Sequence, residues 1–137
     1  MKPTVLVADG DAELCELYQM FLSDYGYEVE TATDGLECLK KLREIRPSVL
    51  VLDLELHWGG ADGVLAWLRQ EHFLSELPVI LTATAGYRSA EVDSIRAKVV
   101  ARLFKPFAPD ELLESLRVGV GRQGEDLPVY RSRVTAC

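Results

Sequence analysis

The sequence is poor in the residues from which disulfides and metal centres are usually built. It has three cysteines and two histidines in 137 residues. Cys15, Cys38 and Cys137 are an odd number and lack the spacing of metal ligands. We interpret Cys15 and Cys38, which fall in predicted helices, as buried reduced thiols. His57 and His72 are too isolated to suggest a metal site.

Long apolar runs and an excess of positive charge are also missing. No stretch approaches the length of a membrane span, and the first ten residues, MKPTVLVADG, lack the pattern of a signal peptide. The net charge of -7 argues against nonspecific binding to nucleic acid or an anionic membrane, because both require a basic surface. We therefore expect a cytoplasmic protein with no membrane partner and no direct contact with nucleic acid.

Short apolar runs alternate with helical patterns along most of the chain. Strands are expected at residues 4–8, 27–32, 49–53, 77–82 and 99–104. Helices are expected over the apolar stripe from Leu14 to Leu22, at about 36–45, 62–71 and 89–97, and from Pro109 to about Val120. Asp11 is well placed to cap the first helix, whereas Ala108 is a poor cap for the last.

Five strands alternating with five helices predict an α/β fold with helices on both faces of a parallel sheet. The leading arrangement is a doubly wound (βα)5, flavodoxin-like three-layer sandwich with strand order 2-1-3-4-5. The chain length suits one such domain, which we place at residues 1–120. Residues 121–137 lack periodicity, and we interpret them as a C-terminal tail or linker.

Polar side chains stand where four of the expected strands end. Asp9 and Asp11 follow the first strand, Asp53 ends the third, Thr82 ends the fourth and Lys105 follows the fifth. Taken alone, Asp53 could simply cap a turn. The carboxyl ends of parallel strands meet at one edge of the sheet, however, so we expect these groups to lie together. Carboxylates suit Mg²⁺, while a hydroxyl and an ammonium suit a phosphoryl group.

At these positions the sequence resembles the receiver domains of two-component response regulators. The resemblance covers about residues 3 to 120 and rests on the motifs VLVADGD, VLVLDLEL, DG at 62–63, PVILTA and LFKPF, in that order. It implies a phosphorelay protein that signals through protein–protein contacts with an output partner. A partner histidine kinase or phosphotransfer protein would supply the phosphoryl group. Such a domain is a switch with weak autodephosphorylation at most, not an enzyme.

The resemblance also implies a role for each residue of the site. Asp53 would be the phosphoacceptor, with Thr82 and Lys105 bonding the phosphoryl group. Asp9, Asp53 and the backbone carbonyl of Glu55 would hold Mg²⁺. The peptide bond from Lys105 to the proline after it would be cis.

Three features depart from the family pattern. Gly10 stands where receivers usually have a second acid, so Mg²⁺ binding is either weakened or supplied by the nearby carboxylates of Asp11 or Glu55. The loop after the acceptor has His57 in place of the usual proline, and it is two residues longer than usual. Trp58 in this loop would pack locally, contact a partner or cover the site. Arg102 occupies the position of the usual switch aromatic, where it is either exposed or contacts an acidic partner.

These departures leave two other functions open. One is a pseudo-receiver, an interaction module that is not switched by phosphorylation, which Gly10 and Arg102 favour. The other is a small phosphatase or phosphotransferase with an aspartyl nucleophile. Such an enzyme usually has an acid two residues beyond the nucleophile, where Glu55 stands, but the usual cap insertion is absent.

Overall fold

The computed structural model describes residues 2–57, 60–70, 76–84 and 98–121. The strands are β1 (Thr4–Ala8), β2 (Glu28–Ala32), β3 (Val49–Asp53), β4 (Pro78–Thr84) and β5 (Lys98–Lys105). The helices are α1 (Ala12–Ser23), α2 (Gly35–Ile45), α3 (Gly60–Gln70) and α5 (Pro109–Gly121). The helix expected at 89–97, Trp58 and the segment beyond 121 lie outside the described residues.

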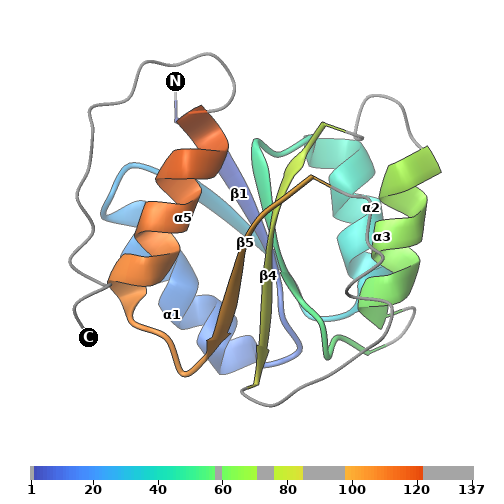
Figure 1. Ribbon diagram of the computed structural model, residues 1–137, viewed down its shortest axis with the longest axis horizontal. Helices are drawn as coiled ribbons and strands as arrows, with labels where there is room; N and C mark the ends of the chain where they lie inside the picture. The colour runs from blue at the N-terminus through green and yellow to red at the C-terminus, as the bar shows by residue number, and fades with distance from the viewer. Residues whose placement is uncertain (1, 58–59, 71–75, 85–97, 122–137) are drawn as a thin grey trace.

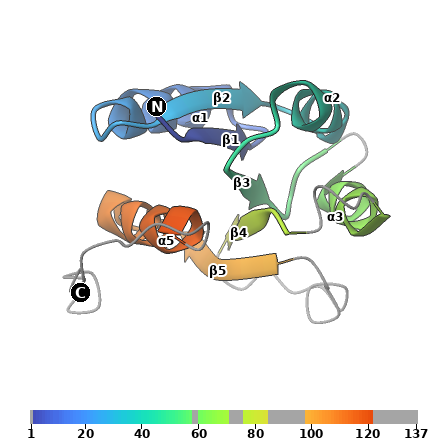
Figure 2. The same cartoon turned by 90° about the horizontal axis from the view of Figure 1, so that it is seen from above.

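The five strands form one parallel sheet in the order β2-β1-β3-β4-β5. Helices α1 and α5 cover one face, and α2 and α3 cover the other (Figure 1). The view from above shows the same three layers, with β1, β3 and β4 between the helices (Figure 2). The doubly wound flavodoxin-like sandwich predicted from the sequence is confirmed.

Alternation along the central strands explains why both faces of the sheet are covered. In β3, Leu50 and Leu52 join the cluster against α2 and α3, whereas Val49 and Val51 join the cluster against α1 and α5. All four side chains are at most 1% exposed. Because the side chains on both faces of this strand are buried, its sequence is a continuous apolar run, and that pattern identified the strand in the sequence.

The ends of several elements differ from the sequence prediction. Strand β4 continues two residues beyond Thr82, because Thr84 still pairs with Lys105 of β5. Helix α3 begins at Gly60, which adopts a positive φ of 62°. Leu17 belongs to the apolar stripe from Leu14 to Leu22 that predicted α1, but it is 60% exposed. It lies on the rim of a groove between α1 and α5, where no described side chain covers it.

Side chains cap the helices that begin near the carboxyl edge of the sheet. As predicted, Asp11 caps α1, accepting hydrogen bonds from the amides of Glu13 and Leu14 at 3.1 and 3.2 Å. Ala108 has no capping side chain, but Glu111 compensates by accepting a bond from the amide of Ala108 at 2.9 Å. Among the described helices, none is long and apolar enough to cross a membrane.

Candidate functional site

The sheet brings Asp9, Asp53, Thr82 and Lys105 together at its carboxyl edge. Asp53 and Thr82 are directly paired across β3 and β4. Lys105 is the last residue of β5, and the bond to Pro106 is cis, as expected. Asp9 is anchored by its own amide, which donates to the carbonyl of Ala32 at 2.9 Å. Asp9, Asp53 and Thr82 are only 2%, 6% and 1% exposed, so three of the four site residues are buried.

Lys105 connects the two buried carboxylates. Its Nζ lies 2.7 Å from Oδ2 of Asp9 and 3.4 Å from Oδ2 of Asp53. The remaining oxygens are also bonded: Oδ1 of Asp9 accepts from the amide of Asp11, and Oδ1 of Asp53 accepts from the amide of Glu55. One ammonium therefore balances two buried negative charges, and it contacts the proposed acceptor less closely than it contacts Asp9.

The pKa values of Asp53 and Lys105 reflect this arrangement of one ammonium and two buried carboxylates. Burial raises the pKa of Asp53; the carboxylate of Asp9 acts in the same direction, and the amide of Glu55 and the ammonium of Lys105 oppose them. Burial also works against charge on Lys105, but the bond to Asp9 and the attraction of both carboxylates outweigh it and raise the pKa of Lys105. Asp53 thus keeps a proton more readily than an exposed aspartate does, while Lys105 stays charged.

Glu55 and Thr84 join the β3–α3 loop to the end of β4 beside the site. Oε2 of Glu55 accepts hydrogen bonds from the amide and the hydroxyl of Thr84, at 2.8 and 2.9 Å. These bonds, the amide bond first, lower the pKa of Glu55. The carboxylate that could have replaced the missing acid is therefore held toward β4.

The side chain of Asp11 is likewise engaged elsewhere. Its Oδ1 caps α1, and the residue is exposed. Gly10 has no positive φ, and a Cβ added to it would meet only the carbonyl of Thr33, at an ordinary 3.7 Å. The backbone at Gly10 therefore does not require glycine. Over the described ranges, three or more acidic, histidine or cysteine side chains nowhere gather as a set of metal ligands.

The other departures from the family pattern lie around this site. Arg102 is exposed on β5, where it pairs with Leu81 in the sheet register. His57 is exposed, and its carbonyl accepts a hydrogen bond from the amide of Gly35 at 2.9 Å. The β3–α3 loop is thus tied to the start of α2.

Two contacts at the site were not predicted from the sequence. Cys15 is a free, buried thiol, as expected, but its Sγ also donates to the carbonyl of Asp9 at 3.3 Å. The bond between Glu55 and Thr84 was missed as well. Because Asp53 pairs with Thr82, Glu55 and Thr84 stand two positions further along from a paired couple and lie next to each other at the carboxyl edge. That register was the signal that could have identified the pair.

Comparisons with known proteins agree with this geometry. Residues 5–117 match the family model of the response regulator receiver domain. A protein of Pyropia yezoensis named probable transcriptional regulator ycf27 is 32% identical over 116 residues, which are 85% of this chain and 46% of that protein. The DNA-binding response regulator MtrA of Mycobacterium leprae is 28% identical over 92% of this chain and 55% of its own length. The chain thus spans about half the length of these curated relatives.

Solved structures with the same fold include two receiver proteins. A CheY-like response regulator receiver domain protein from Methanospirillum hungatei has a TM-score of 0.79 at 26% identity, covering 90% of this chain and 97% of that one. The chemotaxis protein CheY4 of Vibrio cholerae has a TM-score of 0.76 at 28% identity, covering 86% and 98%. With the family model matching most of its length, the chain belongs to the response regulator receiver domain family of two-component systems.

Proposed function

We propose that this receiver accepts a phosphoryl group on Asp53 from a histidine kinase or phosphotransfer protein. The observation that carries the proposal is the contact of Lys105 Nζ with both Asp9 and Asp53, beside the hydroxyl-bearing Thr82. A carboxylate, a hydroxyl and an ammonium at one strand edge are the groups that phosphoryl transfer to aspartate needs.

In the proposed step, a carboxylate oxygen of Asp53 attacks the phosphorus of a phosphohistidine. The new O–P bond forms as the P–N bond breaks, and the imidazole leaves with the bonding electrons and takes up a proton. Lys105 lies close enough to Asp53 to follow the negative charge onto a phosphoryl oxygen. The hydroxyl of Thr82 donates a hydrogen bond to a second oxygen. Water slowly hydrolyses the acyl phosphate, so the protein acts as a switch and not as an enzyme.

Magnesium fits this site, with a small set of protein ligands. Asp9, Asp53 and the carbonyl of Glu55 would hold it, and waters would complete its shell, as Mg²⁺ prefers. The bound ion would offset the repulsion between two carboxylates and an incoming phosphate. The ammonium of Lys105 already lies 2.7 Å from Oδ2 of Asp9, so a metal ion at that oxygen would compete with it. Together with Gly10, this competition supports weak binding.

The output of the switch is a protein–protein contact. MtrA is named as a DNA-binding response regulator, and this chain spans about half of its length. We infer that the domain passes its signal to an output protein or domain, while the net charge of -7 disfavours direct nucleic-acid binding. Arg102, on the exposed side of β5, suits an acidic partner surface.

Phosphoryl uptake can be tested on the isolated protein. The protein is incubated with Mg²⁺ and acetyl phosphate, and its intact mass is followed over time. In parallel, beryllofluoride is added while the amide chemical shifts around Thr82 are recorded. We expect a single phosphoryl adduct and large shifts at Thr82. Absence of both would favour the pseudo-receiver, and rapid turnover of added phosphoesters would indicate a phosphatase.

Gly10→Asp should strengthen magnesium binding. The position tolerates a side chain, and a second acid beside Asp9 adds a carboxylate ligand. We expect the dissociation constant for Mg²⁺ to fall roughly tenfold, equivalent to about 1.4 kcal/mol, as measured by calorimetric titration. Gly10→Asn is the matched control, because it has the same shape without the charge.

The same titration decides the role of Asp11. Asp11→Asn keeps a good helix cap and removes only the charge. Since Oδ1 of Asp11 is bonded to the amides of α1, we expect unchanged Mg²⁺ affinity. A clear loss of affinity would instead make Asp11 a metal ligand.

A further inference from the structure

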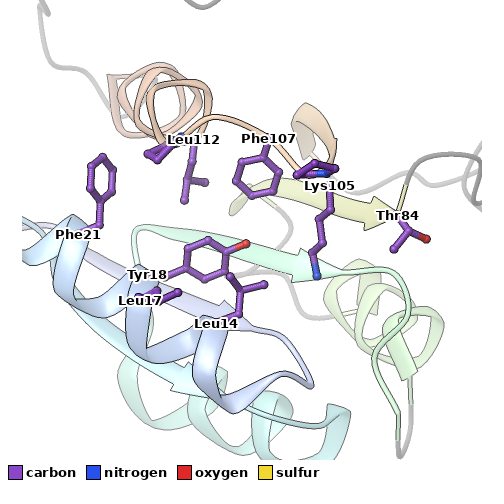
Figure 3. Close-up of a pocket in the computed structure, with 10 residues that line it drawn as sticks. Leu14, Leu17, Tyr18, Phe21, Thr84, Lys105, Phe107 and Leu112 are labelled. Atoms are coloured by element: carbon purple, nitrogen blue, oxygen red, sulfur yellow. The ribbon is translucent and has the colours of Figure 1, made fainter.

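A groove of about 510 Å³ runs between α1 and α5, and at one end Lys105 and Thr84 line it. Its walls are mostly apolar and aromatic, and include Leu14, Leu17, Tyr18, Phe21, Phe107 and Leu112 (Figure 3). The rings of Tyr18 and Phe107 stack with their centroids 6.2 Å apart. Leu17 is 60% exposed at the rim. The groove has the volume of a typical binding site and leaves apolar surface in water.

The part of the chain that follows α5 contains a short apolar run. Residues 122–137 read RQGEDLPVYRSRVTAC, in which LPVY at 127–130 is flanked by acids before it and arginines after it. We propose that residues 127–130 of this chain bind in the groove between α1 and α5. The apolar side chains of this segment would cover Leu17 and the aromatic pair.

The length of the intervening chain suits this placement. Helix α5 begins near the site and ends at the opposite edge of the sheet, where a Cβ added to Gly119 would meet Pro78 and Val49. Leu112, in the groove wall, therefore lies about 14 Å back along the helix from Gly121. An extended chain from Gly121 to Leu127 spans up to about 20 Å. The tail can thus turn at the end of α5 and return along it to the groove.

Charge also favours this direction. A tail returning along α5 runs toward the edge at which α1 and α5 begin. Three exposed acids lie there: Asp11, which caps α1, Glu13 on α1, and Asp110 on α5. Arg131 and Arg133 follow the apolar run and would lie against them. The attraction between these arginines and acids would add to the apolar contacts in the groove, and it would set the direction in which the tail runs.

The native cysteines allow a test on the full chain. Cys15 and Cys38 are buried, and burial raises the pKa of their thiols to about 11 and about 12. Thiolate is the reactive form, so a thiol-specific nitroxide should attach at Cys137 alone. Cys137→Ser should then take up no label. Paramagnetic attenuation of amide signals reports which part of the domain lies near the label.

We expect strong attenuation at Leu17 and Phe107, and full intensity across α2 and α3 on the other face. Leu17→Lys and Tyr130→Asp should each abolish the strong attenuation around the groove. The matched control is Leu36→Lys, because Leu36 is similarly exposed, at 63%, but lies on α2. Thermal unfolding of each variant shows whether the fold is retained, and Tyr130→Asp tests the proposal without altering the groove.

Two results would overturn the proposal. One is uniform weak attenuation in the wild-type chain, or a local pattern that survives both Leu17→Lys and Tyr130→Asp. The other is the same attenuation in isotope-enriched protein that carries no nitroxide, once it is mixed with spin-labelled protein that is not isotope-enriched. That outcome would place a second copy, and not the chain's own tail, in the groove.

Discussion

Asp53→Asn is expected to abolish the phosphoryl adduct and, in the same protein, to stabilise the fold at pH 7. The carboxylate of Asp53 is buried, and Lys105 lies nearer to Asp9 than to it. An amide of the same shape removes the buried charge, while Lys105 keeps its 2.7 Å partner. We expect a gain of about 1 kcal/mol, the usual size of one stabilising substitution, measured by urea unfolding in the presence of EDTA.

The pH dependence of this gain follows from the raised pKa of Asp53. A carboxyl group that holds its proton more tightly in the folded state stabilises that state at low pH and loses this effect as it ionises. The gain from Asp53→Asn should therefore be largest at neutral pH. It should disappear below about pH 3.9, where the aspartate is protonated in both states.

Asp34→Asn is the matched control for the charge change. Asp34 caps α2 by accepting from the amide of Glu37 at 2.8 Å, and asparagine caps equally well. We expect little change in stability at either pH. A loss of stability in Asp53→Asn would mean that the attraction of Lys105 for Asp53 outweighs the cost of its burial.

Lys105→Met should have the opposite effect on stability, and a larger one. It leaves Asp9 and Asp53 buried at 2% and 6% exposure without a counter-charge. Removing one partner from a buried ion pair costs about 3 kcal/mol or more. We expect a loss of about this size at pH 7, and impaired phosphoryl uptake. Asp9→Asn combined with Lys105→Met should recover part of the stability, because one of the two unpaired charges is gone.

A second lysine offers the control. Lys98 lies 2.8 Å from Glu76, but the side chain of Glu76 is 80% exposed. Exposed ion pairs contribute little because water screens them. Lys98→Met should therefore leave the urea midpoint nearly unchanged. An equal loss in both variants would show that removal of a lysine, and not exposure of the buried carboxylates, causes the effect.

The loss in Lys105→Met should shrink as the pH falls, since protonated carboxyl groups need no ammonium. In the wild-type protein, the raised pKa of Lys105 makes stability depend on pH at the alkaline end. The stabilisation that Lys105 provides is complete below the ordinary lysine pKa of about 10.4, and it is lost as the pH rises through the higher pKa of the folded state.

The fold and the polar residues at the carboxyl edge of the sheet could be predicted from the sequence because their signals are local. Buried parallel strands such as Val49–Asp53 appear as continuous apolar runs. Any polar residue that ends such a run must stand at the carboxyl edge. Asp53, Thr82 and Lys105 were identified in this way, and the cap on α1 followed from Asp11 standing directly before an apolar stripe.

Contacts across the fold could not be predicted in the same way. The sequence left open whether Asp11 or Glu55 replaces the acid missing at Gly10. The structure directs the carboxylate of Asp11 into a helix cap and that of Glu55 to Thr84. The cap at Asp11 is local and was predicted, but the contact between Glu55 and Thr84 joins segments 29 residues apart, and no periodic signal in the sequence specifies it.

By itself, then, the sequence determined the order of the elements and which polar residues stand at the carboxyl edge of the sheet, because apolar periodicity and strand ends are patterns of neighbouring positions. Only the tertiary structure decided that Lys105 lies 2.7 Å from Asp9 and 3.4 Å from Asp53. It also decided that α1 and α5 leave Leu17 beside an open groove. Distances between segments that are remote in the chain depend on how the layers pack, and no local pattern specifies them.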